Sequence, residues 1–82
     1  DSGDGYADIT LRSAKHNVAV VIELKYAASR AELKDKAREA LRQIIDKDYA
    51  EAVRDDSVHR IFGFGIAFFH RKCAVEAAEL PL

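Results

Sequence analysis

The stretch VAVVIELK, residues 18–25, decides how the rest of this chain folds. β-Branched and aliphatic side chains dominate it, so we expect a buried β-strand. Because side chains alternate between the two faces of a strand, Glu23 and Lys25 share one face and Leu24 lies on the other. Burying a carboxylate and an ammonium group is costly unless each is paired or binds something. Glu23 and Lys25 are therefore candidate site residues.

The segment before this stretch predicts a second strand that folds back on it. Residues 6–12 alternate between polar and apolar side chains, which is typical of a half-buried strand. Residues 13–17 form a short polar connection, which favours an antiparallel hairpin with residues 18–25. In that hairpin, paired residue numbers sum to about 31 to 33, which places Asp8 opposite residues 23–25. We therefore expect Asp8 to converge with Glu23 and Lys25.

The middle of the chain predicts a helix. Ser29 and Glu32 match the S-x-x-E capping box, and apolar residues recur at helical spacing over residues 31–47. Residues 49–53 are either a further turn of this helix or a separate short helix. Tyr49 either packs over the rim of a site or, as we favour, is a core residue with its hydroxyl in water.

Residues 58–69 predict a third strand, and residues 73–77 a last one. The third is apolar on both faces, which is typical of a central strand covered on both sides, and Gly63 and Gly65 within it allow a helix to approach closely. Cys73 is expected to be a small buried residue. The order is strand, strand, helix, strand, strand. The helix therefore serves as a crossover, and we predict an α/β fold with a mixed sheet and one parallel pair.

Size and composition limit the classes of protein that fit. The chain has 82 residues, 49% of them hydrophobic and 33% charged, which supports a single small domain over residues 1–82. The net charge of -1 gives no overall attraction for nucleic acid, so any basic surface is local. One cysteine excludes an intrachain disulfide. The longest apolar run, residues 61–69, is too short to cross a bilayer, and we expect a cytoplasmic protein without membrane contact.

Two carboxylates at the edge of a sheet suit a hard divalent cation. Asp8 and Glu23 would supply ligands to Mg²⁺ (or Mn²⁺), and the backbone carbonyl of Leu24 lies in reach as a third. Lys25 would orient or help to deprotonate an attacking water, or stabilise charge on a phosphate. The alternative is a structural ion pair at the end of a sheet, with no chemistry attached.

The spacing of these residues resembles a known family. Asp8, fourteen intervening residues and then Glu23-Leu24-Lys25 resemble the D…ExK signature of the PD-(D/E)xK nuclease superfamily, although Ala7 replaces the usual proline. The wider pattern is similar to the branch found C-terminal to AAA-ATPase-like modules in bacterial proteins. That pattern comprises residues 5–8, 20–25, 40–44, 47–50 and 61–68.

The resemblance implies a restriction-endonuclease-like fold and Mg²⁺-dependent hydrolysis of DNA by Asp8, Glu23, Lys25 and Gln43. Gln43 matches a position where relatives place a polar residue on the helix that faces the site. The family core begins with a helix and a strand that this chain lacks, and the chain starts at Asp1 and contains no methionine. We therefore expect an N-terminally truncated, partial domain.

The uncovered apolar face of such a domain would favour a homodimer or strand exchange. The alternative function is a catalytically silent nuclease-like module used for interaction or assembly, with an AAA-ATPase-like module in the same protein.

Overall fold

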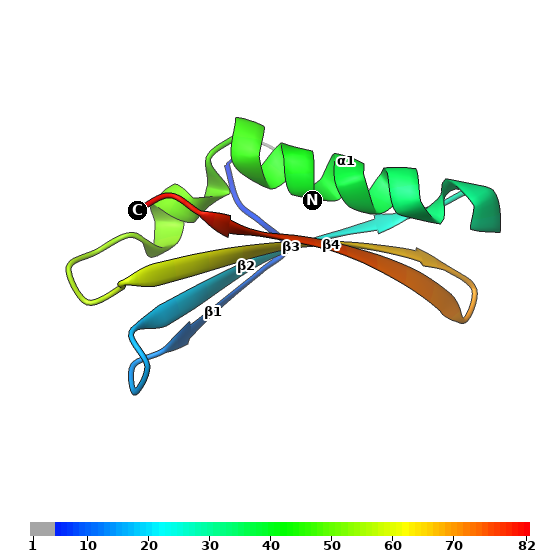
Figure 1. Ribbon diagram of the computed structural model, residues 1–82. Helices are drawn as coiled ribbons and strands as arrows, with labels where there is room; N and C mark the ends of the chain where they lie inside the picture. Colours follow the sequence, from blue (N-terminus) through cyan, green and yellow to red (C-terminus); the bar gives the residue numbers. More distant parts are fainter. Residues whose placement is uncertain (1–4) are drawn as a thin grey trace.

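Four strands form one sheet in the order β1-β2-β3-β4, and a single long helix lies across one face of it (Figure 1). The computed structural model describes residues 5–82, so most of residues 1–5, a polar stretch with two glycines that is typical of a loop, lies outside the described residues. The elements are β1 (Ile9–Ser13), β2 (Val18–Tyr26), the 3₁₀ helix η1 (Arg30–Glu32), α1 (Leu33–Asp46), the 3₁₀ helix η2 (Tyr49–Val53), β3 (Arg60–Phe69) and β4 (Lys72–Leu80).

The predicted mixed sheet is confirmed. β1 and β2 form an antiparallel hairpin, β2 and β3 are parallel, and β3 and β4 are antiparallel. A parallel pair requires a crossover, and α1 provides it between β2 and β3. In the first hairpin Ile9 pairs with Ile22, so the paired residue numbers sum to 31, within the predicted range.

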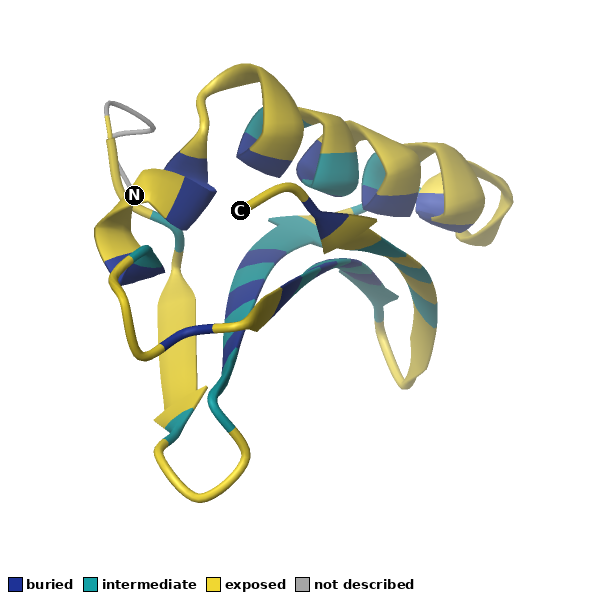
Figure 2. Cartoon of the chain, turned by 60° about the vertical axis from the view of Figure 1, so that its left-hand side comes forward, coloured by how far each residue is buried: buried dark blue, intermediate teal, exposed yellow. Residues whose placement is uncertain are grey.

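The core lies between the sheet and α1. Ala19 and Val21 of β2 point toward the helix and are fully buried, as are Ile61 and Ala67 of β3. Figure 2 shows the buried positions of α1 along its sheet-facing side. These positions recur at helical spacing, which is the amphipathic pattern that the sequence predicts; they are Leu33, Ala37, Ala40 and Ile44.

Gly65 lets the helix lie unusually close to the sheet. A Cβ atom at Gly65 would meet the carbonyl oxygen of Ala37 and the amide nitrogen of Leu41, both in the backbone of α1. The predicted close approach at the glycines is thus confirmed here. Gly65 is also the register partner of Glu23, so this close approach of the helix lies beside the candidate site.

The second face of the sheet, here called the open face, has no covering element among residues 5–82 (Figure 1). β3 is an inner strand, but the prediction that both of its faces are buried is wrong, because buried and half-buried residues alternate along it. Cys73 is exposed, which contradicts its predicted burial. The larger apolar side chains at open-face positions are Ile9, Leu11, Val18, Val20, Ile22, Leu24, Tyr26, Phe62, Phe64, Ile66, Phe68 and Val75.

The helix begins differently from the prediction. The Ser29 side chain makes no capping hydrogen bond; instead the Glu32 N–H donates to the Ser29 carbonyl oxygen at 3.2 Å, forming the 3₁₀ turn that precedes α1. The predicted capping box is therefore wrong, although the predicted helix range is nearly right. Residues 49–53 form a separate short helix, which settles that alternative. None of the described helices is long and apolar enough to cross a membrane.

Candidate active site

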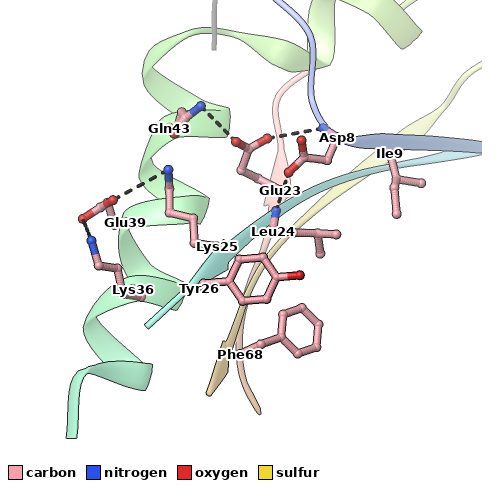
Figure 3. A pocket seen from close by; sticks show the side chains of 10 residues that line it. All are labelled: Asp8, Ile9, Glu23, Leu24, Lys25, Tyr26, Lys36, Glu39, Gln43 and Phe68. Carbon is pink, nitrogen blue, oxygen red and sulfur yellow. Dashed lines mark hydrogen bonds and ion pairs between the residues drawn. The ribbon is translucent and has the colours of Figure 1, made fainter. Parts of the chain in front are cut away.

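The hairpin register brings Asp8 against Glu23. Asp8 stands one residue before the first paired residue of β1, and Glu23 one residue after its partner on β2. The Asp8 N–H donates to Glu23 Oε1 at 3.3 Å, and the Leu24 N–H donates to Asp8 Oδ2 at 2.8 Å (Figure 3). Both carboxylates are therefore fixed by backbone groups, and the predicted convergence of Asp8 and Glu23 is confirmed as geometry.

Glu23 is a buried carboxylate held from the helix. Only 2% of the residue is exposed, and Gln43 Nε2 donates to Glu23 Oε2 at 3.0 Å. The same Gln43 nitrogen lies 2.9 Å from the hydroxyl oxygen of Tyr49, to which it also donates. Tyr49 is 1% exposed, so it supports Gln43 from the core and does not cover the rim of a site.

Burial raises the pKa of Glu23, and the nearby charge of Asp8 raises it further. The N–H of Asp8 and the ammonium of Lys25 act in the opposite direction. The buried carboxylate of Glu23 and the exposed carboxylate of Asp8 lie side by side and repel each other, and a bound cation would relieve both this repulsion and the cost of burying Glu23.

Lys25 lies on the same face as Glu23, as predicted, but its ammonium group reaches toward the helix. Lys25 Nζ is 3.7 Å from Glu39 Oε2, and Lys36 Nζ is 3.3 Å from Glu39 Oε1. The Lys25 side chain is 22% exposed, so the pair is only partly screened by water. Glu39 thus holds two ammonium groups beside the paired carboxylates (Figure 3).

Lys36 and Glu39 are site residues that the sequence analysis missed. A helical signal for them exists, because Lys36, Glu39 and Gln43 follow one another at spacings of three and four and so share a face of α1. Because Gln43 faces the site, its neighbours on the same face of the helix are candidate site residues as well.

The paired carboxylates, the two lysines and the polar residues of α1 that face them line one open cleft of about 760 Å³ at the end of β2. The cleft opens there because β1 starts at Ile9, opposite Ile22, and leaves the last residues of β2 without a neighbour on that side. The lining residues are Asp8, Ile9, Glu23, Leu24, Lys25, Tyr26, Lys36, Glu39, Gln43 and Phe68 (Figure 3).

The donor set fits an ion that keeps much of its water. The described residues contain no cluster of three or more histidine, cysteine, aspartate or glutamate side chains arranged to hold a metal. Asp8 and Glu23 are two carboxylates, and Mg²⁺ is typically bound by one or two carboxylates together with several waters. A closed structural zinc site requires four protein ligands and does not fit here.

The fold and this cleft define a class: a restriction-endonuclease-like α/β protein, with an acid on one arm of a hairpin and an E-x-K sequence on the other. Residues 1–78 match the sequence model of the PD-(D/E)XK nuclease superfamily, and the chain belongs to that superfamily. Comparisons with curated proteins and with solved structures gave no match. Membership in the superfamily indicates a nuclease-like function.

Proposed function

We propose that this chain hydrolyses phosphodiester bonds of DNA with the help of Mg²⁺ or Mn²⁺. The observation that carries the proposal is the pair Asp8 and Glu23, fixed side by side at the mouth of a cleft that also contains Lys25. When bound, the ion would lower the pKa of a water and offset negative charge on a phosphoryl oxygen.

The chain would hold the ion through Asp8, Glu23 and the backbone carbonyl of Leu24. The Leu24 N–H donates to Asp8, which supports a place for the Leu24 carbonyl among the ligands. The N–H and C=O groups of one strand residue point toward the same neighbouring strand, so we expect the Leu24 carbonyl on the Asp8 side of β2.

The remaining groups would act on the water and the phosphate. Lys25 brings an ammonium group to the cleft, where it would orient the attacking water or stabilise charge on the phosphate. Gln43 already donates to Glu23, so its role would be to hold that carboxylate in position. Glu39 forms an ion pair with the Lys25 ammonium group, and a bound phosphate would compete with Glu39 for that ammonium group.

The direct test is cleavage of plasmid and oligonucleotide DNA by the chain with Mg²⁺ or Mn²⁺. We expect cleavage by the parent chain, and its loss in Asp8→Ala and Lys25→Ala, because each substitution removes a group acting on the reacting atoms. Lys34→Ala is the matched control, since Lys34 is an exposed lysine of α1 outside the cleft. Absence of cleavage by the parent chain with either ion contradicts the proposal.

The open face supports a second candidate function, a catalytically silent module that assembles with a second copy of itself. Strands about 4.8 Å apart and roughly 30 Å long give this face a projected area of roughly 500 Å². Side chains standing on it present more surface than the projection, approaching the roughly 800 Å² per partner of a standard interface. Arg60 and Glu79, which pair at 2.7 Å, leave one end of the face without net charge. An AAA-ATPase-like module in the same protein stays a prediction.

Sedimentation tests this second candidate. We expect the parent chain to dimerise and Ile66→Lys, at an open-face position of β3, to be monomeric, because a lysine cannot be buried there without a partner. Ile45→Lys is the control, since Ile45 is 47% exposed on α1, outside the sheet. A silent module also predicts no stabilisation by Mg²⁺, so a rise in melting temperature that Glu23→Ala abolishes would count against it.

A further inference from the structure

Two aromatic rings lie at the end of the cleft farthest from Gln43. Tyr26 is the last residue of β2, and Phe68 is its register partner on β3. Their ring centroids are 6.2 Å apart, with the ring planes inclined at 45°. Both residues line the same cleft as the paired carboxylates, and Figure 3 shows the two rings side by side.

Tyr26 faces away from α1, on the open face of the sheet, at the end of β2. At 85%, it is the most exposed large hydrophobic side chain among the described residues. β1 begins too late to cover this end of β2, so the ring borders the cleft beyond the β1 edge. An exposed aromatic ring beside a charged site is suited to stacking on a flat ligand.

Nucleobases are the flat groups that accompany phosphates in a nuclease substrate. A base within a duplex is covered on both faces by its neighbours, whereas an unpaired base has a free face to stack on an aromatic side chain. Tyr26 lies three residues beyond Glu23, about 10 Å along the strand and on its opposite face. The cleft includes both faces of β2 at the end that β1 leaves free, so a DNA strand with a phosphate at the carboxylates would pass around that end and bring a flanking base to the rings.

We propose that Tyr26 and Phe68 form a stacking surface for an unpaired base of the DNA strand held at the carboxylates. The substrate class is then single-stranded or locally unpaired DNA. This inference rests on the proposed function, because it assigns a substrate to the same cleft. Lys25 and Lys36, on the helix side of the cleft, pair with Glu39, and the phosphates of such a strand would compete with Glu39 for their ammonium groups.

The test measures binding, so that it does not depend on cleavage. Fluorescence anisotropy with a labelled single-stranded DNA oligonucleotide, in Ca²⁺, gives the dissociation constant. We expect Tyr26→Ala to weaken binding roughly tenfold or more, the factor expected for one lost stack between a base and an aromatic ring. Tyr26→Phe keeps the ring and should bind like the parent. Tyr6→Ala is the control, since Tyr6 is also highly exposed, at 76%, but lies outside the cleft.

A scan with a single abasic site moved along the oligonucleotide locates the stacked base. The parent chain should lose affinity at one position of the abasic site, and Tyr26→Ala should be insensitive to it, because both changes remove the same contact. The inference is overturned if Tyr26→Ala binds like the parent, if Tyr26→Phe is as weak as Tyr26→Ala, or if Tyr26→Ala alters sedimentation and not DNA binding.

This experiment separates the inference from the proposed function. Ring-dependent binding by a chain that cleaves nothing would sustain the stacking surface and contradict the nuclease. Metal-dependent cleavage by a chain whose DNA affinity is unchanged in Tyr26→Ala would support the nuclease and contradict the stacking surface.

Discussion

Glu23→Gln is expected to lower metal-dependent cleavage by roughly 10³-fold or more, since a bound metal ion supplies several kcal/mol of transition-state stabilisation. Glutamine has the shape of glutamate, and its amide oxygen can still accept one of the two hydrogen bonds that Glu23 accepts, from Gln43 or from the Asp8 N–H. The metal-free variant should therefore fold, with its free energy of unfolding at neutral pH within about 1 kcal/mol of the parent or above it. Cleavage assays and chemical denaturation measure the two effects separately.

The pH dependence of stability gives this variant a second readout. The pKa of Glu23 is raised in the folded chain above its ordinary value of 4.5, so the folded state binds that proton more tightly than the unfolded state. In the metal-free parent, this contribution to stability is present below pH 4.5 and is lost as the pH rises through the raised pKa. Denaturation at several pH values should show that loss in the parent and its absence in Glu23→Gln.

With Mg²⁺ present, the stability of the parent should instead rise as the pH rises through this range, because the ion binds the ionised carboxylate. Glu32→Gln is the matched control, since Glu32 is exposed and outside the cleft. Full cleavage by Glu23→Gln would show that the carboxylate does not hold the ion.

The geometry of the site was predictable because it follows from local rules. Alternation along a strand places Glu23 and Lys25 on one face, and a short polar connection limits the hairpin register to a few residues. These rules alone predict Asp8 opposite residues 23–25, without any contact beyond the hairpin. The observed register agrees with this placement.

The features that the sequence did not reveal depend on tertiary packing. The Ser29 side chain competes with the Ser29 carbonyl oxygen for the N–H of Glu32, and in the folded chain the carbonyl accepts it, which forms the 3₁₀ turn. The apolar even-numbered residues of β3 indicate burial on both faces, but nothing within residues 5–82 covers the second face. The pairing of Lys25 with Glu39 requires the helix to be placed over the sheet, which no local pattern specifies.

Gly65→Ala is expected to cause the largest loss of stability of any single-methyl addition considered for this chain. The new Cβ would meet backbone atoms of Ala37 and Leu41, and the Cβ of Ala40 at 3.0 Å. Backbone atoms within a helix cannot rotate away, so α1 must shift as a whole. Overpacking of this kind costs about 3 kcal/mol, a large share of the roughly 4 to 12 kcal/mol expected for a domain of this size.

The matched control is Gly63→Ala, two residues earlier on the same strand and face. The atoms nearest to its Cβ would be the ends of the Leu80 and Leu41 side chains, at 3.1 Å and 3.4 Å, and these can give way. We expect a change within about 1 kcal/mol for this variant, since one flexible contact is adjusted and no backbone moves. Urea denaturation of both variants measures the difference, and equal stability of the two would contradict the close approach of α1 at Gly65.

The displacement of α1 in Gly65→Ala would also reach the site. Gly65 is the register partner of Glu23, and Gln43 bonds to that carboxylate from the helix that must move. A shift of even 1 Å would stretch this hydrogen bond beyond its useful range, since such bonds weaken above about 3.2 Å. Any Gly65→Ala chain that still folds should therefore bind Mg²⁺ more weakly than Gly63→Ala. The metal-induced rise in melting temperature measures this difference in Mg²⁺ binding. An equal rise in the two variants would show that the position of α1 does not affect metal binding by the carboxylates.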